Sequence, residues 1–355
     1  MGIEQDLLRV SFTLVRFAAF VGNALLFGVV PLLLLVLRPG FKVLGAESWS
    51  GGRADLALRL EGLARSALVA SAVSTVLALL LQTALVATLG DGELRLSSLE
   101  SVLGTSFGIW SSVRLPVLAA LAVLLFKRIQ VAALAGITDS EKGPGLAWWS
   151  LWGGLGLVLL ATWSFSGHAA VSSPRWAAIF NDIVHLAAGA TWFSGIIVLA
   201  IALPDSWQGR ELLDRTRVLS EVVGRFSRVA LVSIAIVAAT GTLNSFFNVE
   251  SPGDLIDSGY GRTLALKITL FFVIVGLGAV NHFFVRRRLE QATKESGAKD
   301  PYGLFRKTLA AELVVGLLLM ASTGLLVGLA RTKDAPPQTA PVLRLERGPD
   351  SGRSS

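Results

Sequence analysis

The sequence predicts an all-α membrane protein, a bundle of about eight transmembrane helices. Of its 355 residues, 53% are hydrophobic and only 16% are charged, and the mean hydropathy is +0.64. Soluble domains carry about 25% charged residues. Several apolar runs also exceed the ~18 residues that indicate a membrane span. The chain is therefore expected to cross a bilayer many times.

The first four spans are apolar runs with isolated polar side chains. Asn23 lies in the first span, Gln82 in the later half of the second, and Arg114 near the start of the third. The fourth begins with three tryptophans, whose rings suit the headgroup level of a bilayer. The expected bounds of these spans, in order, are 14–37, 66–89, 113–126 (continuing towards residue 134) and 146–166.

The last four spans follow the same pattern, and the fifth ends at Pro204, which is a poor residue for a helix interior. The sixth carries Thr240, Asn244 and Asn248 at intervals of four, which places a polar stripe on one helical face. The expected bounds of these spans, in order, are 176–203, 229–248, 264–285 and 308–330.

Basic residues are concentrated in alternate loops, and this distribution predicts the orientation of the bundle. The loops after the odd-numbered spans are basic, as in Arg286, Arg287 and Arg288, whereas the loops after spans two and six are acidic. Because cytoplasmic loops carry the excess of lysine and arginine, both termini are predicted to face the outside. The net charge of +7 then reflects these loops, and no nucleic-acid binding is expected.

A single transmembrane domain is expected over residues 1–335, followed by a disordered polar tail over residues 336–355. The tail contains prolines, glycines and serines and little apolar content. The first ten residues lack a basic segment and a small-residue cleavage site, so no removable signal peptide is expected.

Under this topology, polar side chains from different spans fall in the outer half of the bundle. His168 lies just past the outer end of span four, and His185 lies ~14 Å inside the outer end of span five. Such groups are costly in a bilayer and normally face the bundle interior or a wet cavity. An outward-opening polar pocket is therefore predicted. Its other candidate residues are Trp192, Thr240, Asn244, Asn248, Gln82, Arg114 and Lys267.

Two further polar residues lie on the cytoplasmic side and are kept apart from this pocket. His282 is near the inner end of span seven, and Glu312 is about one turn into span eight. Both are placed to pair with each other or with Arg286.

The histidines of the pocket allow two interpretations. In the first, His168 and His185 bind copper, zinc or iron, and Asp182 is a further oxygen ligand or orients the imidazole of His185. In the second, His185 bonds a backbone carbonyl or Asn244, and His168 is solvated in a loop. The residues by themselves leave both interpretations open.

The surrounding residues have similar alternatives. Trp192 is either a wall beneath the site or an aromatic side chain packed between helices. Thr240, Asn244 and Asn248 either bond a neighbouring helix or line the cavity. Arg114 and Lys267 either extend to lipid headgroups or take part in the site.

Composition and motifs exclude several other chemistries. There is no cysteine, which rules out disulfides, iron–sulfur clusters and thiolate metal sites. The two methionines, Met1 and Met320, are too few for a methionine-rich copper relay. The sequence contains no Gly-rich phosphate loop and no HExxH motif, so no enzymatic activity is predicted.

Several short motifs follow one another along residues 10–335. They are Ser166-Gly167-His168-Ala169, the D-x-x-H-x-x-A-x-x-x-W segment of Asp182, His185, Ala188 and Trp192, Arg225-Phe226-Ser227-Arg228, Thr240-Gly241, Tyr260-Gly261-Arg262 and Asn281. In this order they resemble the CopD family, the copper-resistance D type of bacterial inner-membrane proteins.

The resemblance implies an eight-span bundle in the bacterial cytoplasmic membrane and a role in copper handling. The family commonly takes up copper across that membrane with a periplasmic copper-binding partner. The resemblance assigns a copper ion, Cu(I) or Cu(II), to His168 and His185. Two alternatives are a b-type haem electron carrier with these histidines as axial ligands, and an assembly subunit whose polar pocket binds a partner protein.

Overall fold

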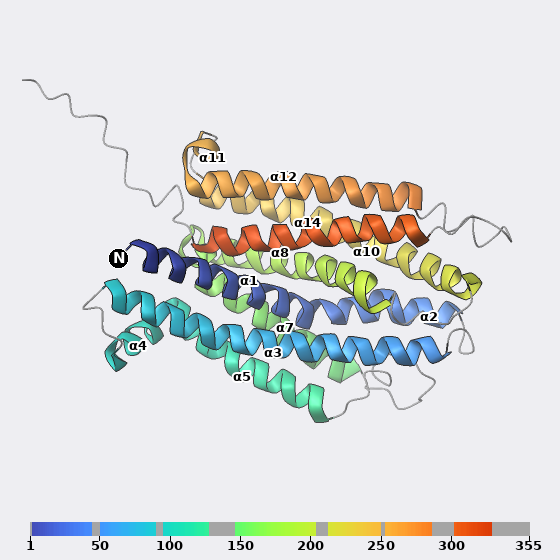
Figure 1. Cartoon of the computed structure of the whole chain (residues 1–355), viewed down its shortest axis with the longest axis horizontal. Helices are drawn as coiled ribbons and strands as arrows, with labels where there is room; N and C mark the ends of the chain where they lie inside the picture. Colours follow the sequence, from blue (N-terminus) through green and yellow to red (C-terminus); the bar gives the residue numbers. More distant parts are fainter. Residues whose placement is uncertain are drawn as a thin grey trace, which may run out of the picture.

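The computed structural model of the chain describes residues 2–44, 50–89, 95–127, 146–203, 212–249, 253–285 and 302–328. These residues form helices joined by short connections, with no strand among them. Eight of the helices are long and apolar enough to cross a membrane, as predicted. They run side by side along the long axis of the molecule (Figure 1). The predicted tail, residues 336–355, and the basic cluster at 286–288 lie outside the described residues.

The spans are built on eight long helices, some of them extended by a short π-helix. The long helices are α1 (Gly2–Leu32), α3 (Ser50–Leu89), α5 (Ser106–Lys127), α7 (Leu146–Ser166), α8 (Arg175–Ile197), α10 (Leu212–Asn248), α12 (Gly259–Val280) and α14 (Tyr302–Gly328). The shorter elements are the π-helices η1 (Leu33–Leu37), η3 (Val198–Ala202) and η4 (Asn281–Val285), the 3-10 helix η2 (His168–Val171), α2 (Arg38–Leu44), α4 (Leu96–Leu103) and α11 (Asp254–Asp257).

Three helices begin much earlier than hydropathy predicts. The bounds of the fourth span agree with the prediction. However, α1 begins at Gly2 rather than residue 14, α3 at Ser50 rather than residue 66, and α10 at Leu212 rather than residue 229. An apolar run marks only the part of a helix that lies in hydrocarbon. The charged extensions remain helical because pairs such as Glu221 and Arg225, whose carboxylate and guanidinium are 2.5 Å apart, support the i, i+4 spacing.

Helix α1 lies at the centre of the bundle and packs against α3, α7, α8 and α14. Of the most apolar 18 residues in each span, 61% are buried in the span that contains α1, but only 11% in the span of α12. At Gly28, a Cβ atom would meet Ala190 and Ser194 of α8, so only glycine permits this approach. Ser194 Oγ then donates a hydrogen bond to the carbonyl of Ala24 over 2.9 Å. These contacts join α1 tightly to the helix that carries the candidate histidine.

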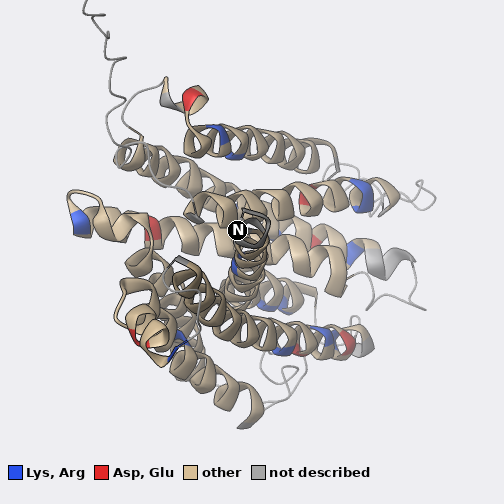
Figure 2. Ribbon diagram, turned by 60° about the vertical axis from the view of Figure 1, so that its left-hand side comes forward, with Lys and Arg blue, Asp and Glu red and all other residues tan. Residues whose placement is uncertain are grey.

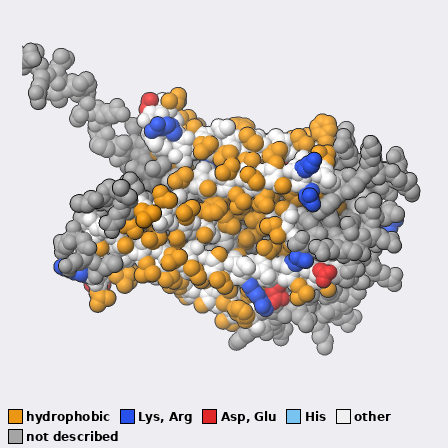
Figure 3. Space-filling view, in the orientation of Figure 1, with side chains coloured by type: hydrophobic (Ala, Val, Ile, Leu, Met, Phe, Trp, Pro, Cys, Tyr) orange, Lys and Arg blue, Asp and Glu red, His pale blue; other side chains and the backbone are white. Residues whose placement is uncertain are grey.

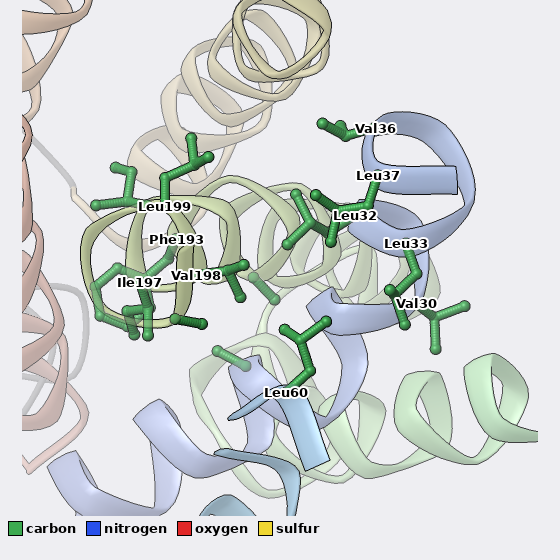
Figure 4. Packing of buried hydrophobic residues seen from close by; sticks show 14 of the residues in the cluster. Val30, Leu32, Leu33, Val36, Leu37, Leu60, Phe193, Ile197, Val198 and Leu199 are labelled. Atoms are coloured by element: carbon green, nitrogen blue, oxygen red, sulfur yellow. The ribbon is translucent and has the colours of Figure 1, made fainter. Parts of the chain in front are cut away.

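Apolar side chains fill the interior and cover the surface. The main buried cluster joins α1, α3, α8 and their neighbours, and a part of it is drawn in Figure 4. Figure 3 shows hydrophobic side chains across the middle of one face, with the described charged residues towards its two ends. Few acidic or basic side chains interrupt the helices between their ends (Figure 2). This distribution is the one expected of a multi-pass membrane protein.

Candidate functional site

A hydrogen-bonded cluster of polar side chains joins α7, α8 and α10 inside the bundle. Asp182 of α8 lies at its centre. Ser164 Oγ of α7 donates to Asp182 Oδ2 over 2.7 Å, and Asn244 Nδ2 of α10 donates to Asp182 Oδ1 over 3.3 Å. Both carboxylate oxygens therefore have a donor, and the side chain is fixed between two helices.

Asn181 completes the connection between α8 and α10. Its Nδ2 donates to Asn244 Oδ1 over 2.8 Å and to the backbone carbonyl of Thr240 over 2.9 Å. Since Asn244 accepts from Asn181 and donates to Asp182, the orientation of its carboxamide is determined by its partners. Interhelical hydrogen bonds of this kind stabilise membrane bundles by roughly 0.6 kcal/mol each.

The hydrogen bonds of His185 determine which of its ring nitrogens carries a proton. Its Nδ1 lies 2.9 Å from Thr240 Oγ1, and that hydroxyl donates to the carbonyl of Ile236 over 2.6 Å. With that hydroxyl hydrogen directed to Ile236, the ring has its proton on Nδ1 and donates it to Thr240. The ring also interacts with the backbone of Val237. In this tautomer the Nε2 atom keeps its lone pair.

A glycine on α10 makes room for this ring. A Cβ atom at Gly241 would lie 3.3 Å from His185 Cε1, closer than ordinary van der Waals contact. The imidazole therefore lies against the backbone of α10, between Thr240 and Gly241. The side chain of His185 is half-buried.

Lys267 of α12 provides a positive charge next to this cluster. It interacts electrostatically with both Asp182 and His185, although it forms no ion pair within 4 Å of the carboxylate. The cluster thus contains one described carboxylate and one ammonium, and both side chains are half-buried. We refer to Ser164, Asn181, Asp182, His185, Thr240, Asn244 and Lys267 as the polar cluster.

His168 lies in η2, outside the polar cluster, and its ring contacts α14 and α12. Its Nε2 is 3.4 Å from the carbonyl of Leu326 in α14, and its ring centroid is 5.8 Å from that of Tyr260 in α12. Tyr260 and Lys267, the α12 neighbours of the two histidines, are seven residues apart, which corresponds to about 10 Å along a helix. The two imidazoles therefore lie at different depths.

Arg114 has its own set of partners between α5 and α7. Its Nε donates to Thr162 Oγ1 over 2.7 Å, and its guanidinium carbon lies 3.8 Å from the ring centroid of Trp163. Only 1% of the residue is exposed, so the side chain does not extend to the headgroups. Arg114 also lies outside the polar cluster, since none of its hydrogen-bond partners belongs to that cluster.

The remaining pocket candidates occupy varied surroundings. Trp192 is 7% exposed and belongs to the main hydrophobic cluster, beside Phe193. Asn248 Nδ2 donates to the backbone carbonyl of Asn244, one turn earlier in α10, over 2.7 Å. Gln82 is on α3, whose main helical partners are α1, α4 and α5 rather than α8 or α10.

A second polar group connects α14 with η4 at the other end of the bundle. Asn281 Nδ2 donates to Glu312 Oε1 over 2.7 Å, and Thr308 Oγ1 donates to Asn281 Oδ1 over 2.5 Å. The carboxylate of Glu312 therefore bonds Asn281, whereas the ring of His282 packs edge-on against Phe283. Arg286, the other expected partner, lies outside the described residues.

Sequence reasoning found the centre of the polar cluster but missed two of its members. Asn181 is four residues before His185 and therefore shares its helical face, a spacing that identifies it in retrospect. Ser164 has no such signal, because small hydroxyl residues are common in membrane helices. In the described part of the chain, no group of three or more histidine, aspartate or glutamate residues could hold a metal ion.

Comparison with known proteins gives a consistent result. One family model, described as copper resistance protein D, matches residues 220–326, and a second, described as the N-terminal domain of copper resistance protein D-like proteins, matches residues 7–178. Copper resistance protein D of Pseudomonas syringae pv. tomato is 28% identical over 312 residues, which are 86% of this chain and 92% of that protein.

A second relative is longer than the chain. Copper transport protein CutJ of Bacillus subtilis (strain 168) is 32% identical over 183 residues. The match covers 52% of this chain but only 30% of the Bacillus protein. No solved structure matches the chain.

Proposed function

Because the chain belongs to the copper resistance protein D family, we propose that it carries copper ions inward across the bacterial cytoplasmic membrane. Copper is the transported substrate and enters from the outer face. It is bound first by His168 and then by His185, deeper in the bundle. A periplasmic copper-binding protein delivers the ion.

The orientation of His185 is the observation that carries this proposal. Its Nδ1 lies 2.9 Å from the Thr240 hydroxyl, and in the tautomer with the proton on Nδ1 the Nε2 atom keeps a lone pair. Metal-binding histidines usually donate their second ring N–H to a fixed acceptor, which sets the tautomer and the ring orientation. Thr240 is placed to serve as such an acceptor for His185.

The number of ligands fits a transported ion better than a permanently bound one. Two imidazoles are enough to bind Cu(I) linearly, and a site with few ligands releases its ion readily. Because the two histidines lie at different depths, we propose that the ion passes from one to the other. Asp182 compensates part of the charge of the ion, while Lys267 limits how tightly a cation is held.

The path beyond His185 follows the polar faces of the bundle. Asn244 and Asn248 offer amide oxygens along α10. Asn281 and Glu312, at the opposite end, provide oxygen ligands on the inner side. In this proposal the ion leaves the protein near Glu312 and His282.

Copper accumulation by intact cells tests the proposal. Cells expressing the wild-type protein should gain more copper from the medium than cells with an empty vector, as measured by elemental mass spectrometry. His185→Ala should remove this gain, whereas Thr242→Val should keep it, because Thr242 is an exposed residue of α10 that bonds only its own helix. Equal copper gain with wild-type and His185→Ala protein, at equal expression, would reject the histidine route.

A further inference from the structure

Two arginines lie close together in the bundle without an acidic partner. Arg16 of α1 and Arg114 of α5 are near enough for their charges to interact. Arg114 donates to neutral oxygens only, on Ser111, Thr162 and Ser166. Arg16 has no hydrogen bond or ion pair to any described residue. Two positive charges at this depth repel each other and lack compensation.

Other polar groups at the same place also lack partners. The Nε of Arg16 is buried and makes no hydrogen bond. The Nε1–H of Trp163 is likewise buried without an acceptor, although the ring stacks on Phe20 with 4.1 Å between centroids and lies beneath Arg114. Asn23 is 0% exposed, and neither atom of its amide has a partner.

These groups share one face of α1. Arg16, Phe20 and Asn23 follow one another at spacings of four and three, which aligns them along a helix. Phe20 contacts Trp163 of α7, so this face of α1 is directed towards α7. Donors from α1, α5 and α7 therefore converge, and no described carboxylate accepts from them.

Arg16 is the accessible member of the arginine pair. Arg16 is half-buried, and its guanidinium carbon lies 4.0 Å from the ring centroid of Phe12 and 6.0 Å from that of Phe107. Because only 1% of Arg114 is exposed, an anion must approach the pair from the side of Arg16.

From these observations we infer a binding site for a phosphate-type oxyanion between α1, α5 and α7. Arg16 is its main ligand, Arg114 adds positive charge beneath it, and the Trp163 N–H is a further donor. The planar guanidinium donates paired hydrogen bonds that match the oxygens of a phosphate group. The anion compensates the two charges that the protein leaves unpaired. Its source is either the headgroup of a phospholipid or free inorganic phosphate. The site is separate from the proposed copper route.

The binding test uses the purified full-length protein after removal of bound lipid. Native mass spectrometry measures the retention of phosphatidylglycerol, and calorimetry measures the binding of inorganic phosphate. Because Arg16→Gln removes charge-assisted hydrogen-bond donors, it should weaken binding roughly 10- to 100-fold. The matched control is Arg175→Gln, because Arg175 is exposed and stacks on Trp176 at the start of α8.

Each outcome of the test has a definite meaning. Arg16-dependent binding of the lipid alone supports the headgroup as ligand, and Arg16-dependent binding of inorganic phosphate supports the free anion. Failure of the wild-type protein to bind either probe would overturn the inference, as would equal binding by Arg16→Gln and Arg175→Gln. Arg16→Lys keeps the charge but loses the paired donors and should bind more weakly than wild type. It replaces Arg16→Gln if that variant does not fold, and full binding by Arg16→Lys would then overturn the role of the guanidinium.

Discussion

Replacing Thr240 with valine tests whether the hydroxyl that holds His185 determines copper affinity. Valine has nearly the same shape as threonine but cannot accept the hydrogen bond from His185 Nδ1, which is 2.9 Å long. The imidazole then loses the partner that fixes its tautomer and orientation. Thr240→Val leaves Asp182, His185 and Lys267 unchanged.

The expected effect on copper affinity is much larger than the effect on stability. Loss of the acceptor that orients a metal-binding histidine typically lowers metal affinity 10- to 100-fold, or about 1.4–2.7 kcal/mol. The lost interhelical hydrogen bond is worth only roughly 0.6 kcal/mol to the bundle. The variant is therefore expected to fold normally and to bind copper weakly.

Competition with a Cu(I) chelator of known affinity measures this difference. Thr242→Val is the control, because Thr242 is two residues further along α10, is exposed and donates to Ala238 of its own helix. Thr240→Ser keeps a hydroxyl and should restore most of the affinity. Equal dissociation constants for the Thr240→Val and Thr242→Val proteins would refute the orienting role of Thr240.

Two further predictions concern stability, measured by thermal unfolding in detergent. Gly28→Ala should destabilise the protein by about 1–3 kcal/mol, because the added Cβ would meet Ser194 of α8, whereas Gly62→Ala, with no atom within 4 Å, should be neutral or stabilising by up to ~1 kcal/mol. Equal melting temperatures of the two variants would contradict the close approach of α1 and α8. Asn281→Leu should destabilise by about 1–3 kcal/mol, because it removes the donor to the buried carboxylate of Glu312; an unchanged melting temperature would show that this bond contributes little.

The sequence was sufficient to predict the eight spans because hydrocarbon selects apolar residues directly. It did not predict where α1, α3 and α10 begin, because charged residues continue each helix beyond its apolar run. Hydropathy measures transfer into lipid and carries no information about where a helix ends. The family resemblance from the motifs is confirmed by both family models.

The polar cluster was predicted in part. The predicted topology placed four of its members in the same leaflet, which was enough to expect them near each other: Asp182, His185, Thr240 and Asn244. The direction of each hydrogen bond was not predictable, because it depends on helix rotation. For the same reason, the sequence suggested Asn244 or a carbonyl as the partner of His185, whereas the structure has Thr240 there. Arg114 shows a further limit, since its partners Thr162 and Trp163 become neighbours only through the packing of α5 on α7.

The copper content of purified protein tests the central claim most directly. After incubation with copper and removal of free ion, elemental analysis should find bound copper in the wild-type protein and little in the folded His168→Ala/His185→Ala variant. An absorption spectrum of the same samples should lack the Soret band of a haem protein. Unchanged copper stoichiometry in the double variant would contradict the histidine route, and a Soret band that disappears with the histidines would assign them to haem instead.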